Sequence, residues 1–327
     1  MIRSASILVS LVKLVDHLPW PPAPDKRPRG CPKRYSDRLI MKALVIMIIR
    51  RLYSAYALLR FLEQDDPVPA ELRRLLVANG QFPSRRTWER RLAALPATLP
   101  GLIGYGGRHL VELLKPWTHQ GRAVSFDSTA LATAGGVWHK KHRDLGEIPH
   151  SSIDTEAGWS KSGWHGWWYG WKLHLAITVG SVWIPLAAEL TVANHADNEV
   201  APRLLAQTPL ETRYVLGDTH YNAPELRAAC QRRGVELVAT RRGAYPHLDD
   251  GAAVRKVFHQ LRSKSIEPFN GLFKGVFEWR VKMPVQGLER SKLLALGAIV
   301  IYQLVLLYQH ERGLPLGQEI KPLLRAA

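Results

Sequence analysis

The order of strand and helix patterns between residues 121 and 313 constrains the fold most. Residues 171–179 alternate apolar and polar side chains, as a half-buried strand does. The full set of expected elements is strands 122–126, 171–179 and 182–192, helix 197–205, strand 213–216, helix 224–233, strand 235–240 and a long helix 254–277. Three strands followed by alternating helices and strands predict an α/β domain, a mixed sheet flanked by helices.

The chain before about residue 120 has a different texture, which is helical and basic. Residues 38–62 carry apolar side chains at helical spacing with Lys and Arg between them. Another helix is expected after Pro83, where Ser84 can cap the N-terminus. These patterns predict a helical, basic, DNA-binding N-terminal domain over 1–120, an α/β domain over 121–313 and a tail over 314–327.

Net charge points to a polyanionic partner. Lys and Arg number 45 against 28 Asp and Glu, a formal charge of +17, which favours nucleic acid, with an anionic membrane surface as the competing interpretation. Residues 293–308 are strongly apolar but shorter than the roughly 20 residues of a membrane span, and Gln303 interrupts them. We therefore expect a buried helix, no membrane partner and a cytoplasmic location.

The helix after Pro83 is a candidate DNA contact. Four arginines, Arg85, Arg86, Arg90 and Arg91, fall within seven positions. They could form a DNA-reading helix or an ordinary solvated basic face, and the sequence supports both about equally. Residues 21–34 read as a basic arm that could also contact phosphates.

Three acidic residues form the candidate catalytic site. Asp127 follows the apolar run 124–126, Asp218 follows strand 213–216, and Glu267 lies on the long helix. Carboxylate oxygens suit Mg²⁺ or Mn²⁺, and two such ions can clamp the attacking and leaving oxygens of a phosphodiester. Each residue also has an ordinary interpretation: Asp127 as a cap, Asp218 as a turn residue, and Glu267 as a surface acid paired with Lys264 or Lys274.

Lys274 lies seven residues after Glu267, so both point to the same face of a helix. A lysine in that position can hold a DNA phosphate as a point charge. Pro268 disfavours helical geometry at Glu267, so the helix is expected to kink or to start there.

At these motifs the chain resembles the DDE transposases of bacterial insertion sequences, of the group related to the fourth and fifth insertion-sequence families. The similar segments are residues 126–129 (FDST), 169–174 (YGWKLH), 194–197 (NHAD) and 217–221 (GDTHY), together with the spacing from Glu267 to Lys274. The resemblance covers the α/β half well and the helical half loosely. It departs at Gln260 and Ser263, where the family has Tyr and Arg, and Arg262 lies one residue early.

The resemblance implies a ribonuclease-H-like domain that cuts double-stranded DNA at transposon ends and joins the 3′-hydroxyl to target DNA. It implies Asp127, Asp218 and Glu267 as metal ligands, a homodimer on DNA and a nucleoid-associated location in a bacterium. Arg262, Lys264 and Lys274 are the expected DNA contacts beside them. The alternatives are a domesticated DNA-binding relative without transposition, and a non-enzymatic basic DNA-binding regulator.

Aromatic residues crowd positions 159–171. Trp171 is expected in the core, whereas Trp164, Trp167 and Trp168 could either pack or stack on an unpaired base near the cut. His174, His195 and His220 lie close to the acidic motifs, but lone histidines are more often structural, and no catalytic role is predicted for them.

Overall fold

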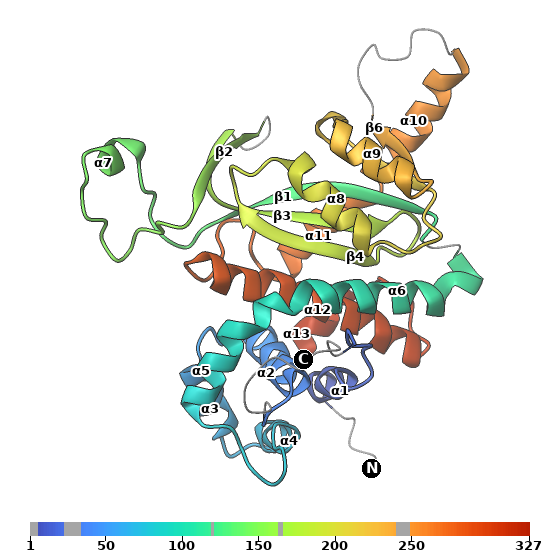
Figure 1. The fold of residues 1–327 in the computed structure, drawn as a ribbon. Helices are drawn as coiled ribbons and strands as arrows, with labels where there is room; N and C mark the ends of the chain where they lie inside the picture. Colours follow the sequence, from blue (N-terminus) through green and yellow to red (C-terminus); the bar gives the residue numbers. More distant parts are fainter. Residues whose placement is uncertain (1–5, 23–33, 119–120, 163–165, 240–248) are drawn as a thin grey trace. The chain divides into compact units, whose positions relative to one another are not determined.

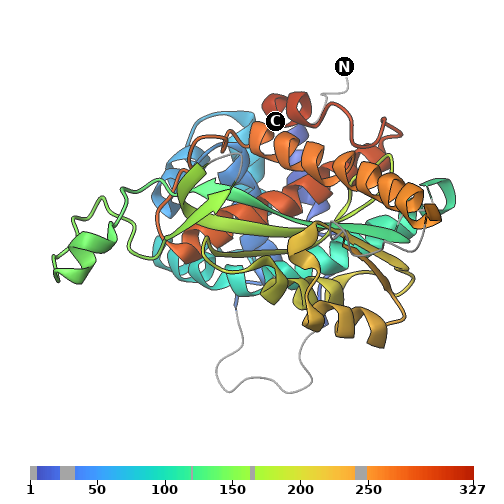
Figure 2. The ribbon, with the colours of Figure 1, turned by 90° about the horizontal axis from the view of Figure 1, so that it is seen from above.

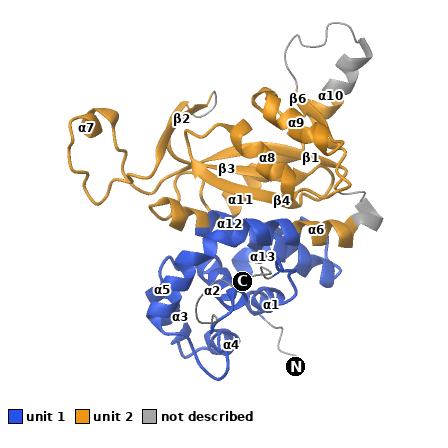
Figure 3. Ribbon diagram, in the orientation of Figure 1, with its two compact units in different colours: residues 1–106, 293–327 blue, residues 107–292 orange. Residues whose placement is uncertain are grey.

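A computed structural model describes residues 6–22, 34–118, 121–162, 166–239 and 249–327, with side chains described outside 115–118 and 249–255. Most of the expected basic arm, residues 23–33, lies outside this part. The chain forms two compact units, residues 1–106 with 293–327, and residues 107–292 (Figure 3). The sequence predicted domain boundaries at residues 120 and 313. The boundaries of the two units fall instead inside two helices, α6 (Leu99–Thr118) and α12 (Leu288–Glu311).

The first unit is helical. The stretch 38–62 forms two helices, because Arg51 adopts a left-handed backbone conformation (φ 57°) and Ser54 caps a new helix. The helix after Pro83 begins as predicted, with Ser84 Oγ accepting a hydrogen bond of 3.3 Å from Thr87 N. Besides parts of α6 and α12, the unit contains α1 (Ile7–Leu14), α2 (Asp37–Ile49), α3 (Ala55–Leu62), α4 (Pro67–Leu75), α5 (Arg85–Ala94), η1 (Leu95–Ala97) and α13 (Ile320–Ala326).

Helix α12 contains the apolar run 293–308. Its length and composition would allow it to cross a membrane, but 83% of its most apolar 18-residue window is buried inside the protein. Gln303, the polar interruption, donates a hydrogen bond of 2.8 Å to the Ile103 carbonyl. The expected buried helix is confirmed, and α13 gives the predicted tail a helix of its own.

The second unit is built on a six-stranded sheet (Figure 1). β3 pairs antiparallel with β1 along one edge and with β2 and then β4 along the other, and β5 and β6 continue from β1 in parallel. This is the predicted mixed sheet. The strands are β1 (Ala123–Ala132), β2 (Gly158–Ser162), β3 (Gly166–Thr178), β4 (Pro185–Val192), β5 (Tyr214–Gly217) and β6 (Glu236–Ala239).

Helices cover both faces of this sheet (Figure 2). α8 (Asp197–Gln207) and α9 (Pro224–Arg232) lie on one face, and α10 (Asp249–Ser263) and α11 (Ile266–Val276) lie on the other. A short helix, α7 (Lys140–Asp144), precedes β2. Apolar side chains from both faces of β1 and β3 are buried, which fixes the positions of the polar residues between them.

The expected single helix 254–277 is broken into α10 and α11. α10 ends at Ser263, and in the turn that follows the Oγ of Ser265 donates to the carbonyls of Leu261 (2.9 Å) and Arg262 (3.0 Å). Pro268 is the third residue of α11. The first four N–H groups of a helix have no partner inside it, so the missing N–H of Pro268 costs nothing there. Starting a new helix resolves the conflict seen in the sequence.

Candidate active site

The site is positioned by a difference in strand length. Asp127 was expected at the end of a strand, but it is the fifth residue of the ten-residue β1, which continues in register with β3 as far as Ala132. The shorter β5 is the strand that ends: its last pairing with β1 is Ser125↔Leu216. Asp127 lies two residues past Ser125 on β1, and Asp218 lies two residues past Leu216, at the start of the turn that follows β5.

The turn after β5 holds Asp218 in place. Its Oδ1 accepts a hydrogen bond of 2.8 Å from His220 N, and its Oδ2 lies 3.2 Å from His220 Nδ1. Gly217 permits this tight turn, because a Cβ at that position would lie 2.7 Å from Cβ of the buried Tyr221. The ring of Tyr221 packs edge-on against Phe126 of β1, which couples the turn to the strand that carries Asp127.

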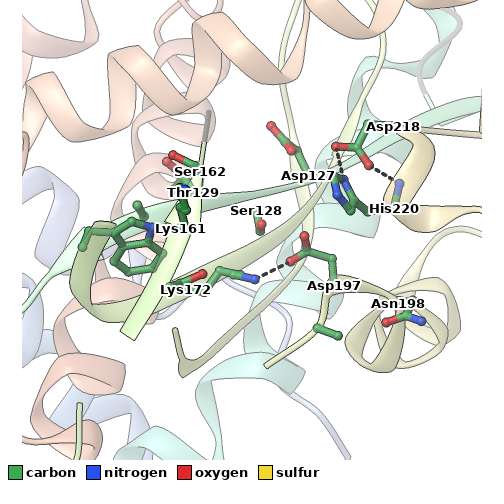
Figure 4. Close-up of a pocket in the computed structure, with 14 residues that line it drawn as sticks. Asp127, Ser128, Thr129, Lys161, Ser162, Lys172, Asp197, Asn198, Asp218 and His220 are labelled. Carbon is green, nitrogen blue, oxygen red and sulfur yellow. Dashed lines mark hydrogen bonds and ion pairs between the residues drawn. The ribbon is translucent and has the colours of Figure 1, made fainter. Parts of the chain in front are cut away.

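A pocket of about 600 Å³ opens along the unpaired edge of β1 (Figure 4). β1, the β2–β3 hairpin, the start of α8 and the turn after β5 form its walls. It brings together two of the three predicted carboxylates, Asp127 and Asp218, with a further one, Asp197.

The electrostatics of Asp127 favour a bound cation. The pKa of its carboxyl is raised to about 7, mainly by burial and to a smaller degree by Asp218 and Asp197, while the Arg262 guanidinium and a hydrogen bond from the Ser128 backbone act in the opposite direction. A carboxylate that is costly to ionise beside two other acids is stabilised by a divalent cation. The donor set at this end of the pocket therefore fits Mg²⁺ or Mn²⁺.

Helix α11 presents a different residue from the one predicted. Asn270 Nδ2 donates to Asp127 Oδ2 at 3.2 Å, whereas the Glu267 side chain, 53% exposed, receives Arg262 Nη2 at 3.1 Å. Among the described residues, no three His, Cys, Asp or Glu side chains lie close enough together to hold one metal ion. The structure places Asp127 and Asp218 in one pocket but pairs Glu267 with Arg262.

The remaining predicted contacts on this side of the sheet differ in exposure. Lys274 is partly buried near Asp127: burial and then Arg280 lower the pKa of its ammonium, while Asp127 raises it. Lys264 is exposed. Of Lys264 and Lys274, it is therefore Lys274 whose charge interacts with Asp127.

A polar cluster that the sequence reasoning left without a role borders the same pocket. Asp197 Oδ1 lies 3.3 Å from Lys172 Nζ and 3.3 Å from Nδ1 of the fully buried His174. Burial would raise the pKa of Asp197, but His174, Lys172 and Ser128 outweigh it and lower that pKa to about 2. Burial lowers the pKa of His174. The segments 169–174 and 194–197 contained the signal for this cluster.

The arginines of α5 divide into two groups. Arg85, Arg86 and Arg90 are exposed. Arg91 is buried and forms an ion pair with Asp37 of α2. Of the four predicted DNA contacts on this helix, Arg91 therefore holds helices together and the other three face solvent.

Comparisons with known proteins place this geometry in a family. Residues 118–304, more than half of the chain, match the model of the transposase DDE domain. No curated protein matches the chain. Two similar solved structures are the Mos1 strand transfer complex and the Mos1 transposase paired-end complex with left transposon end, both 16% identical with a TM-score of 0.22. The two alignments cover 86% and 87% of this chain, and 80% and 82% of the respective Mos1 chains.

TM-scores this low do not support a structural assignment. The assignment of the chain to a family therefore depends on the family match and on the residues within it. Both the pocket and α11 lie inside the matched segment. The chain belongs to the family of transposase DDE domains.

Proposed function

We propose that this transposase cuts DNA at the ends of a mobile element and joins the freed 3′-hydroxyl to target DNA. The observation that carries the proposal is the placement of Asp127 and Asp218 in one pocket, where burial makes ionisation of Asp127 costly without a cation. Buried acids with a raised pKa in a pocket are typical of functional sites, and a divalent cation would offset the cost of ionising Asp127.

Asp127, Asp218 and Glu267 would hold two Mg²⁺ ions, with Mn²⁺ as a substitute, and Glu267 would exchange its Arg262 partner for metal. When bound, the metals supply an activated oxygen nucleophile and stabilise the leaving oxygen. Lys274 and Arg262 would hold phosphate oxygens on either side of the carboxylates. Asn270 would keep the carboxylate of Asp127 oriented.

Double-stranded DNA is the proposed partner, as transposon end and as target. The formal charge of +17 supports a polyanionic partner, and so does membership of the transposase DDE family. Arg85, Arg86, Arg90 and Lys264 are exposed cations available for that contact. We propose a homodimer in the DNA complex, since two ends must be cut and joined together.

The test is cleavage of DNA that flanks the gene, by purified protein with Mg²⁺ or with EDTA. Asp127→Asn, Asp218→Asn and Glu267→Gln keep shape and remove charge, so each should lower cleavage by orders of magnitude while DNA affinity stays equal or rises. Glu199→Gln is the matched control, because Glu199 is an exposed acid of α8 that does not line the pocket. Specific binding without cleavage by the wild type would favour the domesticated relative or the regulator.

A further inference from the structure

The hydroxyl of Tyr221, in the turn after β5, is buried and unused. The residue is 1% exposed, and its hydroxyl has no hydrogen-bond partner among the described residues. A buried polar group without a partner costs stability, and a contact with a bound ion or a part in the reaction is the usual explanation for one. A phenylalanine would fill the same space without that cost, so the oxygen atom is the feature that needs a function.

The ring of Tyr221 is held in one direction by its neighbours. Gly217 leaves room for it, since a Cβ there would lie 2.9 Å from Tyr221 Cγ. The ring of Phe126 packs edge-on against it, with 6.1 Å between the centroids, and the turn also packs against α8. Phe126 precedes Asp127 on β1, so the two side chains take opposite faces of the sheet. Tyr221 therefore lies on the α8 face, whereas Asn270 contacts Asp127 from α11.

The hydroxyl lies in the electrostatic field of the acids that line the pocket. The pKa of Tyr221 is raised well above its usual range, first by burial and then by Asp197, Asp127 and Asp218, while Arg262 acts in the opposite direction. The hydroxyl therefore keeps its proton. It is a hydrogen-bond donor that faces negative charge.

Two of these three acids already have partners near them. Asp218 accepts a hydrogen bond within its own turn, and Asp197 lies against a lysine and a buried histidine of β3. Asp127 has a side-chain donor from α11, on the other face of the sheet. The last pairing of β5 with β1 is at Ser125, so the edge of β1 beside Asp127 is open to a side chain from the turn.

We propose that Tyr221 is a positioning residue of the metal site, and that its hydroxyl donates to the Asp127 carboxylate when a divalent cation is bound. The inference rests on the proposed function and adds a residue that touches neither the metal nor the DNA. Carboxylates that ligate a metal are themselves hydrogen-bonded, and loss of such a bond typically costs roughly 10- to 100-fold in metal affinity or activity. Asn270 and Tyr221 would hold the carboxylate from the two faces of the sheet.

The test compares the wild type with Tyr221→Phe, which removes one oxygen atom and keeps the ring. Mn²⁺ affinity, titrated by electron paramagnetic resonance at pH 8.5 without DNA, should weaken about tenfold. The melting temperature in EDTA should equal that of the wild type or exceed it, because the cost of an unpartnered hydroxyl is removed. A hydroxyl with a purely structural role would lower the melting temperature on removal and leave Mn²⁺ affinity unchanged.

Tyr302→Phe is the matched control, since Tyr302 is also 1% exposed but belongs to the helical unit. Its Mn²⁺ affinity should match that of the wild type. Asp197→Asn, made with and without Tyr221→Phe, identifies the acceptor. The loss caused by Tyr221→Phe should persist in the Asp197→Asn protein, and its disappearance there would overturn the assignment to Asp127.

The outcomes separate this inference from the proposed function. If the wild type shows no Mn²⁺ binding that depends on Asp127, the metal site is rejected and the role of Tyr221 with it. If the wild type binds Mn²⁺ through Asp127 and Tyr221→Phe binds it equally well, or if Tyr302→Phe weakens it by the same factor, only the role of Tyr221 is rejected.

Discussion

Asn270 Nδ2 donates a hydrogen bond of 3.2 Å to Asp127 Oδ2, which ties α11 to β1 at the centre of the site. Asn270 lies three residues after Glu267 and four before Lys274, so these three positions share one face of α11. That face is directed toward Asp127 even though the Glu267 carboxylate itself is bound to Arg262. Because Glu267 lies on the same face of α11 as Asn270, a different rotamer of its side chain would direct the carboxylate toward Asp127.

Glu267→Gln should mainly lower the cleavage rate, whereas Asn270→Ala should mainly lower the stability of the fold. The first should lower the single-turnover cleavage rate at least about 100-fold, because a metal ligand is lost. The second should cost about 1–2 kcal/mol of unfolding free energy, the worth of a buried hydrogen bond, and lower cleavage by less than about tenfold. Quenched-flow cleavage and urea unfolding measure the two effects. An inactive Asn270→Ala variant together with an active Glu267→Gln variant would show that α11 contributes to cleavage through Asn270 and not through Glu267.

Asp127 should make the metal-free protein less stable as pH rises. Its pKa is raised from 3.8 to about 7 in the folded chain, so the protonated folded form is favoured, and that stability is complete below pH 3.8 and lost as pH rises to 7. In EDTA, the unfolding free energy of wild type minus that of Asp127→Asn should fall over this window, by on the order of a few kcal/mol. Mg²⁺ should restore it at pH 8. Parallel curves for the two proteins would remove the electrostatic argument for a cation.

Arg262→Gln should tighten metal binding once Asp127 is ionised. The guanidinium lowers the pKa of Asp127 and pairs with Glu267, so it acts as a cation that competes with the metal. At pH 8.5 its removal should lower the Mn²⁺ dissociation constant by roughly tenfold, as measured by titration with electron paramagnetic resonance. DNA affinity should fall in the same variant, because a phosphate contact is lost.

Lys264→Gln is the control for this measurement, since Lys264 is exposed two residues away. Its Mn²⁺ affinity should match that of the wild type. Equal changes in the Mn²⁺ dissociation constant for Arg262→Gln and Lys264→Gln would contradict a competition between the Arg262 guanidinium and the metal.

Asp197→Asn should destabilise the protein through the pair it forms with Lys172 and the buried His174. Breaking such a pair in the interior costs about 3–5 kcal/mol, and partial solvent access of Asp197 reduces the expected loss to about 1–3 kcal/mol. Since the pKa of Asp197 is lowered to about 2, this contribution is present above pH 3.8 and lost as pH falls toward 2. Urea unfolding between pH 2 and 7 measures it, with Glu199→Gln as the exposed control from the same helix.

The α5 arginines should separate into DNA contacts and a structural ion pair. Arg86→Ala and Arg90→Ala should each flatten the slope of log affinity against log salt by about 0.9 if they contact phosphates. Arg91→Ala should leave that slope unchanged and lower the melting temperature, because it removes the ion pair between the buried Arg91 and Asp37. A reduced slope for Arg91→Ala with unchanged stability would contradict the division seen in the structure.

The sequence was enough to predict five of the six strands, because the alternation in β3 and the short apolar runs are local signals, but it did not predict β2. The length of β1 was not predictable in the same way. Apart from Leu131, residues Ser128 to Ala132 are polar or small and lack a clear apolar alternation. They are extended because β3 pairs with them across the sheet, a contact between residues far apart in the chain.

Two features of the site depended on contacts that no local pattern encodes. The role of Asp197 emerges only when α8 brings it against Lys172 and His174 of β3. Conversely, Arg91 shares the basic pattern of its neighbours, yet helix packing buries it against Asp37. The spacing from Glu267 to Lys274 was readable from the sequence, whereas the side-chain partner of Glu267 was not.

The early end of β5 has a consequence for how this enzyme could be altered. Beyond Ser125, β1 has no strand partner among the described residues on the side where β5 has stopped, and the pocket lies along this part of β1. Inserting residues that lengthen β5 past Gly217 would complete the ladder and fill the place where substrate enters. Variants that extend the sheet would then be more regular proteins and worse catalysts, so selection for thermal stability alone would work against activity here.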